Sequence, residues 1–196
     1  MKKAMLLALV AALVSLSTGA ARSEPAPVPS GGAPPSAAEL RNRLSAAGIA
    51  VPKDAGAIAA EDFELAALAG GKLKLSSFRG SVVYLNFWAT WCPPCRAEMP
   101  SMERLYTRLK DKGLEIVAVD LQESKDQVQK FVKENKLTFT VLLDSSGTVG
   151  SAYGAQSIPT TYLVDRRGMI LGRSIGGREW DSPDMLALFE AVLAAK

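Results

Sequence analysis

The sequence predicts an α/β domain with a mixed central sheet flanked by helices. Strand and helix patterns alternate between residues 81 and 144, which indicates parallel strands joined by helical crossovers. Two later strand patterns, 161–165 and 169–175, are separated only by a three-residue turn, so they pair as an antiparallel hairpin. A sheet with both parallel and antiparallel pairs follows from this order of elements.

The first elements lie ahead of this alternating region. Residues 36–39 (Ser-Ala-Ala-Glu) form a capping box, which opens a short helix with Leu40 and Leu44 on one face. Residues 63–65 and 72–75 alternate apolar and polar side chains on either side of two glycines, which is typical of a β-hairpin. The fold is therefore expected to begin with a short helix and an N-terminal β-hairpin.

The central part predicts three buried strands and two helices. The apolar runs with the composition of buried strands are 81–88, 114–120 and 139–144. Residues 93–112 carry apolar side chains at helical spacing, and Pro100 is expected to kink that helix. Ser124 begins a second capping box, which opens a central helical insertion over 125–135.

The C-terminal part predicts a short helix over 148–154, the antiparallel hairpin and a final helix. Ser182 caps that last helix, and Pro183 occupies its first turn, where the missing N–H would have no helical partner. The residues expected to face inward from it are Leu186, Phe189 and Leu193.

The N-terminal segment resembles a targeting sequence. Lys2 and Lys3 precede an apolar run over 4–14, and a small, weakly polar stretch follows, which is typical of a signal peptide over residues 1–23. An uncleaved membrane anchor is the alternative, although this apolar run is short against the roughly 20 residues that span a bilayer. Both interpretations place the folded part outside the cytoplasm, in a bacterial periplasm or cell envelope.

The rest of the chain divides by composition. Residues 24–38 contain five prolines and two glycines, as in a disordered spacer. Residues 39–60 hold the short helix and a connection, and 61–196 form the main folded domain. Beyond residue 23 the 20 remaining basic residues balance 20 acidic ones, which argues against nucleic acid as a partner.

Two absences limit the chemistry. The chain has no histidine, which excludes Ser-His-Asp and Cys-His catalysis and histidine-ligated zinc. It has only two cysteines, which excludes four-cysteine zinc sites and iron–sulfur clusters, so we predict no metal ligands and no cofactor. A bond between Cys92 and Cys95 would enclose two residues and constrain the unfolded chain little, so the pair serves chemistry rather than stability.

Cys92 falls where the strand at 81–88 gives way to the helix at 93–112. There the helix dipole and free N–H groups favour the thiolate form of a cysteine. Cys95, one turn further along, is expected to be more buried. The spacing suits thiol–disulfide exchange, in which the Cys92 thiolate attacks a substrate disulfide and Cys95 resolves the mixed disulfide.

Other interpretations of the pair are weaker. A zinc site would need two further ligands, and covalent haem attachment would need a histidine where the chain has Arg96. Two inert buried thiols remain as the plain structural alternative.

Two segments carry a family resemblance. Residues 84–100 (YLNFWATWCPPCRAEMP) resemble the active-site segment of thioredoxin-fold proteins, and 157–165 (SIPTTYLVD) resemble the cis-proline loop and following strand of that fold. Together with the hairpin and the helix at 125–135, they are similar to the membrane-associated TlpA/ResA branch. The resemblance covers about residues 61–196 and implies a thioredoxin-like fold and thiol–disulfide oxidoreductase activity.

The resemblance also implies roles for individual residues. Cys92 is then the nucleophile and Cys95 the resolving thiol, and Pro159 is expected to be cis and to lie against the pair. The backbone of Ile158 would pair with an extended client strand. The residues expected to contact the client are Trp91, Pro93, Pro94 and Ile158. Core packing would explain Trp91 equally well.

The group that moves the proton is less clear. Asn86 stands where cytoplasmic thioredoxins carry a buried aspartate, and asparagine cannot accept the Cys95 proton. Pro93 stands where some relatives place a glutamate between the cysteines. Glu98 is the nearest acid, three residues after Cys95, unless it lies on a solvated helix face. Glu98 and a hydrogen-bonding Asn86 are therefore the candidates for proton transfer.

The two residues between the cysteines favour a reductant. Pro93 and Pro94 have no N–H to donate to the Cys92 thiolate, and no histidine is present to stabilise it. A strong oxidant owes its potential to a stabilised reduced form. We therefore predict a disulfide reductase rather than an oxidant.

Three functions follow. The first is an extracytoplasmic disulfide reductase, kept reduced by a membrane thiol reductant, whose client is an apocytochrome c or a copper-site protein, as the resemblance implies. The second is a periplasmic disulfide oxidant or isomerase. The third is a Cu(I) metallochaperone that uses Cys92 and Cys95. Against the third, Met99, Met102 and Met185 have the spacing of core residues.

Overall fold

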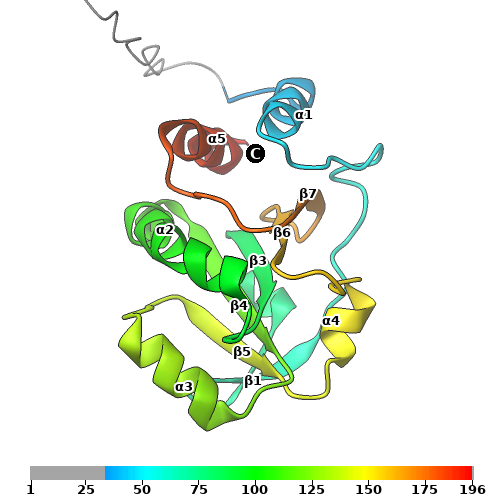
Figure 1. The fold of residues 1–196 in the computed structure, drawn as a ribbon. Coiled ribbons are helices and arrows are strands. Elements are labelled where there is room, and N and C mark those ends of the chain that lie inside the picture. The colour runs from blue at the N-terminus through cyan, green and yellow to red at the C-terminus, as the bar shows by residue number, and fades with distance from the viewer. Residues whose placement is uncertain (1–33, 196) are drawn as a thin grey trace, which may run out of the picture. The chain divides into compact units, whose positions relative to one another are not determined.

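The computed structural model describes residues 34–195, so the predicted signal segment 1–23 and most of the predicted spacer lie outside it. Seven strands form a sheet in the order β2-β1-β5-β4-β3-β6-β7 (Figure 1). The three strands at its centre are parallel, and both flanks carry antiparallel pairs. The predicted α/β class with a mixed sheet is confirmed.

The central strands are the apolar runs of the sequence. β3 (Val82–Trp88) is buried along its whole length and pairs in parallel with β4 (Leu114–Leu121), which pairs in parallel with β5 (Thr140–Asp144). Strands covered on both faces have no polar side to present, which is why these runs do not alternate. β6 (Thr160–Val164) pairs antiparallel with β3, and β7 (Ile170–Ile175) follows it.

The N-terminal hairpin forms as predicted. β1 (Glu64–Ala67) and β2 (Lys72–Lys74) are antiparallel, and β1 joins the sheet against β5. In the turn between them, Gly70 and Gly71 have φ values of 110° and 74°, a backbone conformation that residues with a side chain rarely adopt. A 3₁₀ helix, η1 (Leu75–Phe78), then leads into β3.

Three helices begin at the predicted capping serines. Ser36, Ser124 and Ser182 each accept a hydrogen bond from the backbone N–H three residues later. The helical elements are α1 (Ala37–Ala46), α2 (Pro93–Leu109), η2 (Lys110–Lys112), α3 (Lys125–Glu134), α4 (Thr148–Ala152) and α5 (Pro183–Ala194). α2 continues through Pro100. Within residues 34–195, no helix has the length and apolarity needed to cross a bilayer.

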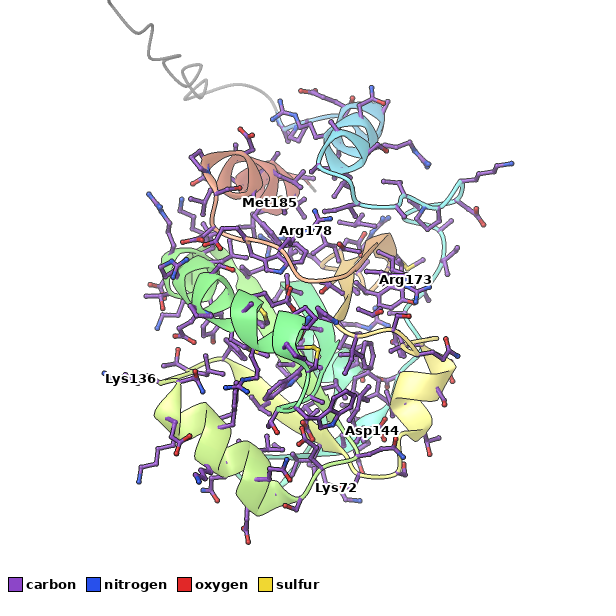
Figure 2. The ribbon with its side chains drawn as sticks, viewed as in Figure 1. Lys72, Lys136, Asp144, Arg173, Arg178 and Met185 are labelled. Carbon is purple, nitrogen blue, oxygen red and sulfur yellow. A yellow bond between two sulfur atoms is a disulfide. The ribbon has the colours of Figure 1, made fainter. Side chains whose placement is uncertain are left out.

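The sheet separates two layers of core. Tyr84 and Trp88 face the layer that holds α1, α2, α3 and α5, whereas Leu85 and Phe87 face α4 and η1. Side chains fill the space between the helices and the sheet (Figure 2). The three methionines predicted to be core residues, Met99, Met102 and Met185, are buried.

The buried face of α5 differs in part from the prediction. Phe189 is fully buried, but Leu186 and Leu193 are only half-buried, and the buried stripe runs through Met185, Leu188, Phe189 and Val192. A stripe through Phe189 can take either set of neighbours at helical spacing. In the orientation that α5 adopts, the Phe189 ring packs on Tyr84 and Trp180, at centroid distances of 6.1 and 6.3 Å.

α1 belongs to the same core. Leu40 and Leu44 are buried in one cluster with residues of α2 and α5, as their spacing predicted. The connection then runs along β7, where Ala50 exchanges two backbone hydrogen bonds with Arg173. Ala37 and Ala38, which the sequence assigned to the spacer, are already helical.

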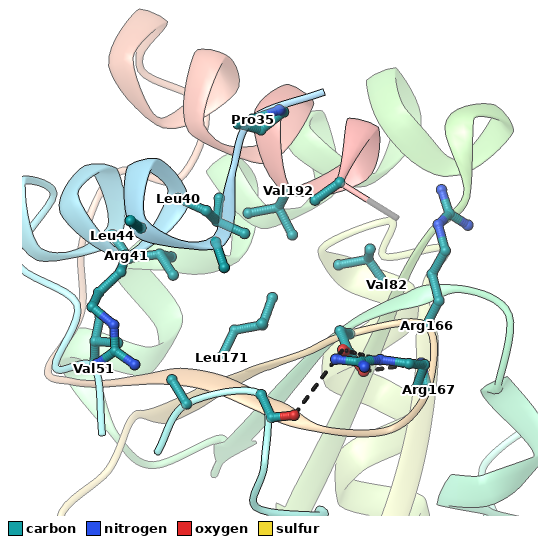
Figure 3. A pocket seen from close by; sticks show the side chains of 16 residues that line it. Pro35, Leu40, Arg41, Leu44, Val51, Val82, Arg166, Arg167, Leu171 and Val192 are labelled. Atoms are coloured by element: carbon teal, nitrogen blue, oxygen red, sulfur yellow. Dashed lines mark hydrogen bonds and ion pairs between the residues drawn. The ribbon is translucent and has the colours of Figure 1, made fainter. Parts of the chain in front are cut away.

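A cavity of about 520 Å³ lies beneath α1 (Figure 3). Its walls are mostly apolar and include Leu40, Leu171 and Val192, with Arg41 and Arg167 beside them. Val82, the first residue of β3, also lines it, so the cavity lies at the end of the sheet opposite the cysteines.

Candidate active site

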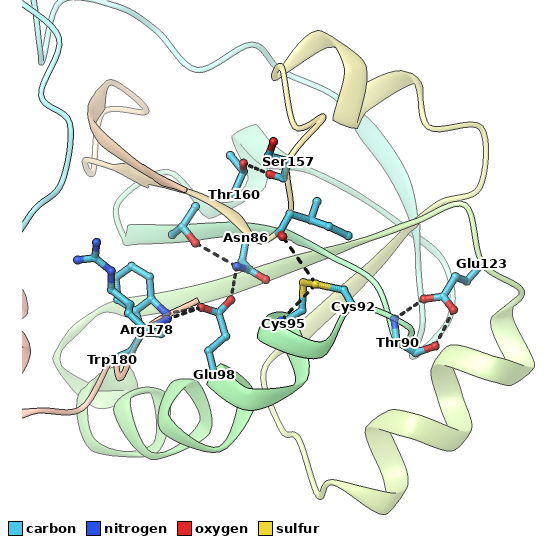
Figure 4. Close-up of a disulfide and its surroundings, with 12 residues drawn as sticks. Asn86, Thr90, Cys92, Cys95, Glu98, Glu123, Ser157, Thr160, Arg178 and Trp180 are labelled. Atoms are coloured by element: carbon cyan, nitrogen blue, oxygen red, sulfur yellow. Dashed lines mark hydrogen bonds between the residues drawn. A yellow bond between two sulfur atoms is a disulfide. The ribbon is translucent and has the colours of Figure 1, made fainter. Parts of the chain in front are cut away.

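The cysteines lie at the junction of β3 and α2. Cys92 is the N-cap of α2, and it forms a disulfide with Cys95, one turn inside the helix (Figure 4). The two Cα atoms are 5.3 Å apart. Cys92 is 3% exposed and Cys95 is fully buried, in the predicted order. Because β3 is a central strand buried on both faces, it holds this junction rigidly at its C-terminal end.

Few groups are placed to stabilise the Cys92 sulfur. The Cys95 N–H points at Cys92 Sγ at 3.3 Å, and the two prolines between them have no N–H to add. The Ile158 carbonyl oxygen lies 3.7 Å from Cys92 Sγ (Figure 4). The Ile158–Pro159 bond is cis, as predicted. The cis-proline loop therefore places a free backbone acceptor directly beside the sulfur.

Trp91 stands out from the surface. Its exposed fraction is 65%, so the alternative that it packs in the core is wrong. It borders a groove of about 470 Å³ that also includes Ile158, and none of the residues lining this groove is charged. Pro93 and Pro94 are exposed at the start of α2. All four residues predicted to contact a client thus have surface beside the disulfide or in the adjoining groove.

Glu98 is buried beneath the disulfide. It lies one turn after Cys95 on α2 and is 2% exposed, so the alternative of a solvated helix face is wrong. Glu98 Oε1 accepts a hydrogen bond from Asn86 Nδ2 at 3.0 Å, and Oε2 accepts one from Trp180 Nε1 at 2.8 Å (Figure 4). The structure thus brings together the two residues proposed for proton transfer.

Burial raises the pKa of Glu98 to about 7, although the hydrogen bonds from Trp180 and Asn86 and the nearby Arg178 oppose this rise. A carboxyl group with a pKa near neutrality can both take and return a proton under ordinary conditions. Sequence reasoning missed Trp180 and Arg178, because they lie about 80 residues from Glu98 and no local sequence motif indicates that they contact it.

The Asn86 amide is held on one side only. Its Nδ2 group donates to Glu98 and to Thr161 Oγ1, both at 3.0 Å. Its oxygen is buried and, among the described residues, accepts no hydrogen bond. A protonated Glu98 would have an O–H to donate, and a rotated Asn86 amide would accept it. Asn86 is therefore suited to either protonation state of Glu98.

A second acidic cluster supports the loop ahead of Cys92. The Glu123 carboxylate accepts hydrogen bonds from both the backbone N–H and the hydroxyl of Thr90 (Figure 4). It also accepts one from Gln127 Nε2. Nearby, burial raises the pKa of Asp120 to about 8, and the proximity of Glu123 adds to the rise. Glu123 thus ties the N-terminal end of α3 to the loop that carries Trp91 and Cys92.

Glu123→Ala should lower the free energy of unfolding by about 1–3 kcal/mol, because it leaves the partly buried Thr90 N–H without its partner. Urea unfolding followed by tryptophan fluorescence measures this change. Glu134→Ala, which removes an exposed carboxylate from the last residue of α3, is the control and should have little effect. Equal losses in the two variants would show that the Thr90 contact contributes nothing.

Across residues 34–195, no three Cys, Asp or Glu side chains gather in an arrangement that could hold a metal ion.

Comparison with known proteins points to the same chemistry. Residues 57–172 match the AhpC/TSA family. The chain is 43% identical over 112 residues to the thiol-disulfide oxidoreductase ResA of Bacillus thuringiensis subsp. konkukian, covering 57% of this chain and 65% of that protein. It is 42% identical over 118 residues to ResA of Halalkalibacterium halodurans, covering 60% of this chain and 67% of that protein. The chain thus spans about two thirds of the length of these curated relatives.

Solved structures agree on the fold. A putative thiol:disulfide interchange protein DsbE from Chlorobium tepidum aligns with a TM-score of 0.64 and 38% identity, over 69% of this chain and 96% of that one. StoA from Bacillus subtilis aligns with a TM-score of 0.56 and 29% identity, over 64% and 96%. The expected thioredoxin-like fold is confirmed.

Proposed function

Because this chain belongs to the AhpC/TSA family and, within it, groups with the ResA thiol–disulfide oxidoreductases, we propose that it reduces disulfides of client proteins outside the cytoplasm. The observation that carries the proposal is the Cys92–Cys95 disulfide at the start of α2, beside the Ile158 carbonyl and above a buried carboxyl group. The N-terminal sequence 1–23 supports the location.

The reaction begins from the dithiol form. The Cys92 thiolate attacks one sulfur of the client disulfide, forming a mixed disulfide and releasing the other client sulfur as a thiolate. Cys95 then loses its proton and attacks Cys92 Sγ, which releases the second client thiolate. Two electrons have passed to the client, and the protein is left with the Cys92–Cys95 disulfide seen in this structure.

Glu98 is our candidate for the proton step. Its carboxylate is the buried acid one turn beyond Cys95, and a pKa of about 7 lets it accept the Cys95 proton and give it up again. Asn86 orients this carboxylate and does not itself take the proton. A membrane thiol reductant would then return the disulfide to the dithiol.

The surface beside Cys92 fits an extended client segment. The carbonyl of Ile158 is available for a backbone hydrogen bond, and the uncharged groove next to Trp91 would receive side chains that flank the client cysteine. Apocytochrome c and copper-site proteins are the clients that the family resemblance favours, for cytochrome c maturation or copper-site assembly.

The reduction potential of the Cys92–Cys95 pair tests the direction of the reaction. We expect a value below about −220 mV, since among the described residues the Cys95 N–H is the single hydrogen-bond donor to Cys92 Sγ, in addition to the dipole of α2. Equilibration with glutathione buffers, followed by tryptophan fluorescence, gives the value. A potential near about −120 mV would instead mark an oxidant or isomerase. Tight Cu(I) binding without reduction of insulin disulfides would contradict both redox functions and indicate a metallochaperone.

A further inference from the structure

The surroundings of Glu98 are completed by residues outside the family match. Trp180 and Arg178 lie beyond its C-terminal end at residue 172, and α1 lies before its N-terminal end at residue 57. We propose that Arg178 is a positioning residue that ties the C-terminal end of α1 to Glu98, so that α1 helps to fix the hydrogen bonds of this carboxyl group. The inference rests on the role given to Glu98 under the proposed function.

The Arg178 side chain reaches the end of α1. Its Nη1 donates to the Ala47 carbonyl at 2.7 Å, and its Nη2 donates to the Gly48 carbonyl at 3.3 Å. A guanidinium group can hold two neighbouring carbonyls at once because its N–H groups are fixed in one plane. Lysine has three donors on a single nitrogen and lacks this fixed planar pair of nitrogens.

The end of α1 is shaped to receive a cation. Gly48 has a φ of 70°, and Ile49 N–H donates back to the Leu44 carbonyl, which closes the helix and turns the chain. The carbonyls of Ala47 and Gly48 therefore point away from the helix at its negative end, where a positive charge is favoured. Leu44 and Ile49 are buried, so this end of α1 is fixed to the core.

The other side of Arg178 contacts the carboxyl group and its partner. The backbone N–H of Arg178 points at Glu98 Oε2 at 3.4 Å, and the guanidinium lies over the Trp180 ring, with Cζ 5.2 Å from the ring centroid. Trp180 itself donates to the same oxygen. Arg178 thus contacts α1 through its side chain. It contacts Glu98 through its backbone and through Trp180, and Figure 4 shows these three residues together.

The segment before Arg178 has little room to move. A Cβ atom on Gly177 would lie 2.7 Å from the Pro94 carbonyl oxygen, so the backbone there rests directly on the first turn of α2. Through Gly177, the backbone next to Arg178 is therefore held against the turn of α2 that carries Pro94.

The test reads the titration of Glu98 in the oxidised full-length chain, by the ¹³C signal of its labelled carboxyl group between pH 5 and 9. In this form the cysteines do not titrate. The other charged or titratable groups facing Glu98 are Tyr84 on β3, whose pKa burial raises well above its ordinary value, and Arg178 itself. Glu98→Gln assigns the signal by its loss.

Gly48→Ala strains the backbone at the carbonyls that Arg178 holds, because alanine disfavours a φ of 70°. We expect it to move the Glu98 midpoint upward by about half a pH unit or more, since the cation and the N–H donors withdraw from the carboxylate. Gly56→Ala is the matched control. Its φ is 83°, but its carbonyl faces Arg167, so the midpoint should stay in place.

Two further variants make the test decisive. Gly48→Asn should restore the midpoint, because asparagine tolerates this conformation. In an Arg178→Ala background, Gly48→Ala should cause no additional shift. Additive shifts, or equal shifts from the two glycine variants, would overturn the proposal. If Gly48→Ala does not fold, Arg178→Lys is compared with Arg41→Lys, since Arg41 also holds two carbonyls but does not touch Glu98.

The readout is independent of catalysis. A chain that reduces no disulfide but shows the coupled titration would refute the proposed function and leave the link between α1 and Glu98 in place. A chain that reduces disulfides without the coupling would refute the link alone.

Discussion

Cys95→Ser protein will accumulate a mixed disulfide with its client, whereas Cys92→Ser protein will not. Cys92 lies at the N-terminus of α2 beside the free Ile158 carbonyl, and Cys95 is fully buried behind it. The first attack therefore belongs to Cys92, and only Cys95 can release the client afterwards. Without Cys95 the reaction stops at the covalent intermediate.

Both variants should reduce insulin disulfides at least roughly a thousand-fold more slowly than the natural chain, as loss of a covalent nucleophile does in other enzymes. Non-reducing gel electrophoresis followed by mass spectrometry detects the adduct and identifies the attached cysteine. Unchanged circular dichroism in each variant controls for folding. An adduct that forms on Cys95 in the Cys92→Ser protein would reverse the two assignments.

Glu98→Gln should remove a large pH dependence from both activity and stability. In the natural chain, burial raises the pKa of Glu98 to about 7, from an ordinary value of 4.5. The folded state therefore holds a proton that the unfolded state has released. The stability contributed by this group is fully present below about pH 4.5 and is lost as the pH rises through about 7.

The size of this effect follows from the pKa difference. A rise of this extent corresponds to about 3 kcal/mol, so the natural chain should lose on the order of 3 kcal/mol more than Glu98→Gln between pH 5 and 8. Urea unfolding of the oxidised proteins at both values measures it. Glu134→Gln, an exposed glutamate, should behave like the natural chain. Parallel curves for the natural chain and Glu98→Gln would mean that Glu98 titrates normally.

The same substitution should slow disulfide reduction on the order of 10²-fold, the lower end of what a general acid–base contributes. The loss should fall on the step in which Cys95 resolves the mixed disulfide. An intact first attack with slow client release is the pattern expected in stopped-flow traces.

Local patterns were sufficient for most of the fold. The capping serines, the glycine turn of the hairpin and the apolar strands each act over a few residues, so a single sequence carries them. The orientation of α5 depends on the contact of Phe189 with Tyr84 and Trp180. The contact with Tyr84 joins residues about 100 positions apart in the chain, and helical spacing alone does not choose between neighbouring stripes.

The site divides in the same way. The strand-to-helix junction placed Cys92 and Cys95 correctly, and the family resemblance identified the cis bond before Pro159. The burial of Glu98 could not be read from α2 alone, since its partners come from β3 and from the segment before α5. The burial of a charged side chain cannot be predicted from its local sequence when its hydrogen-bond donors come from distant segments.

The short span of the Cys92–Cys95 bond has a thermodynamic consequence. Because the disulfide encloses only two residues, it barely restricts the unfolded chain. Any difference in stability between the oxidised and reduced proteins must then arise in the folded state, and a closed cycle equates that difference with a shift in potential of about 30 mV for each 1.4 kcal/mol. Two unfolding curves, one for each redox form, should therefore give the difference in reduction potential between the folded and the unfolded protein.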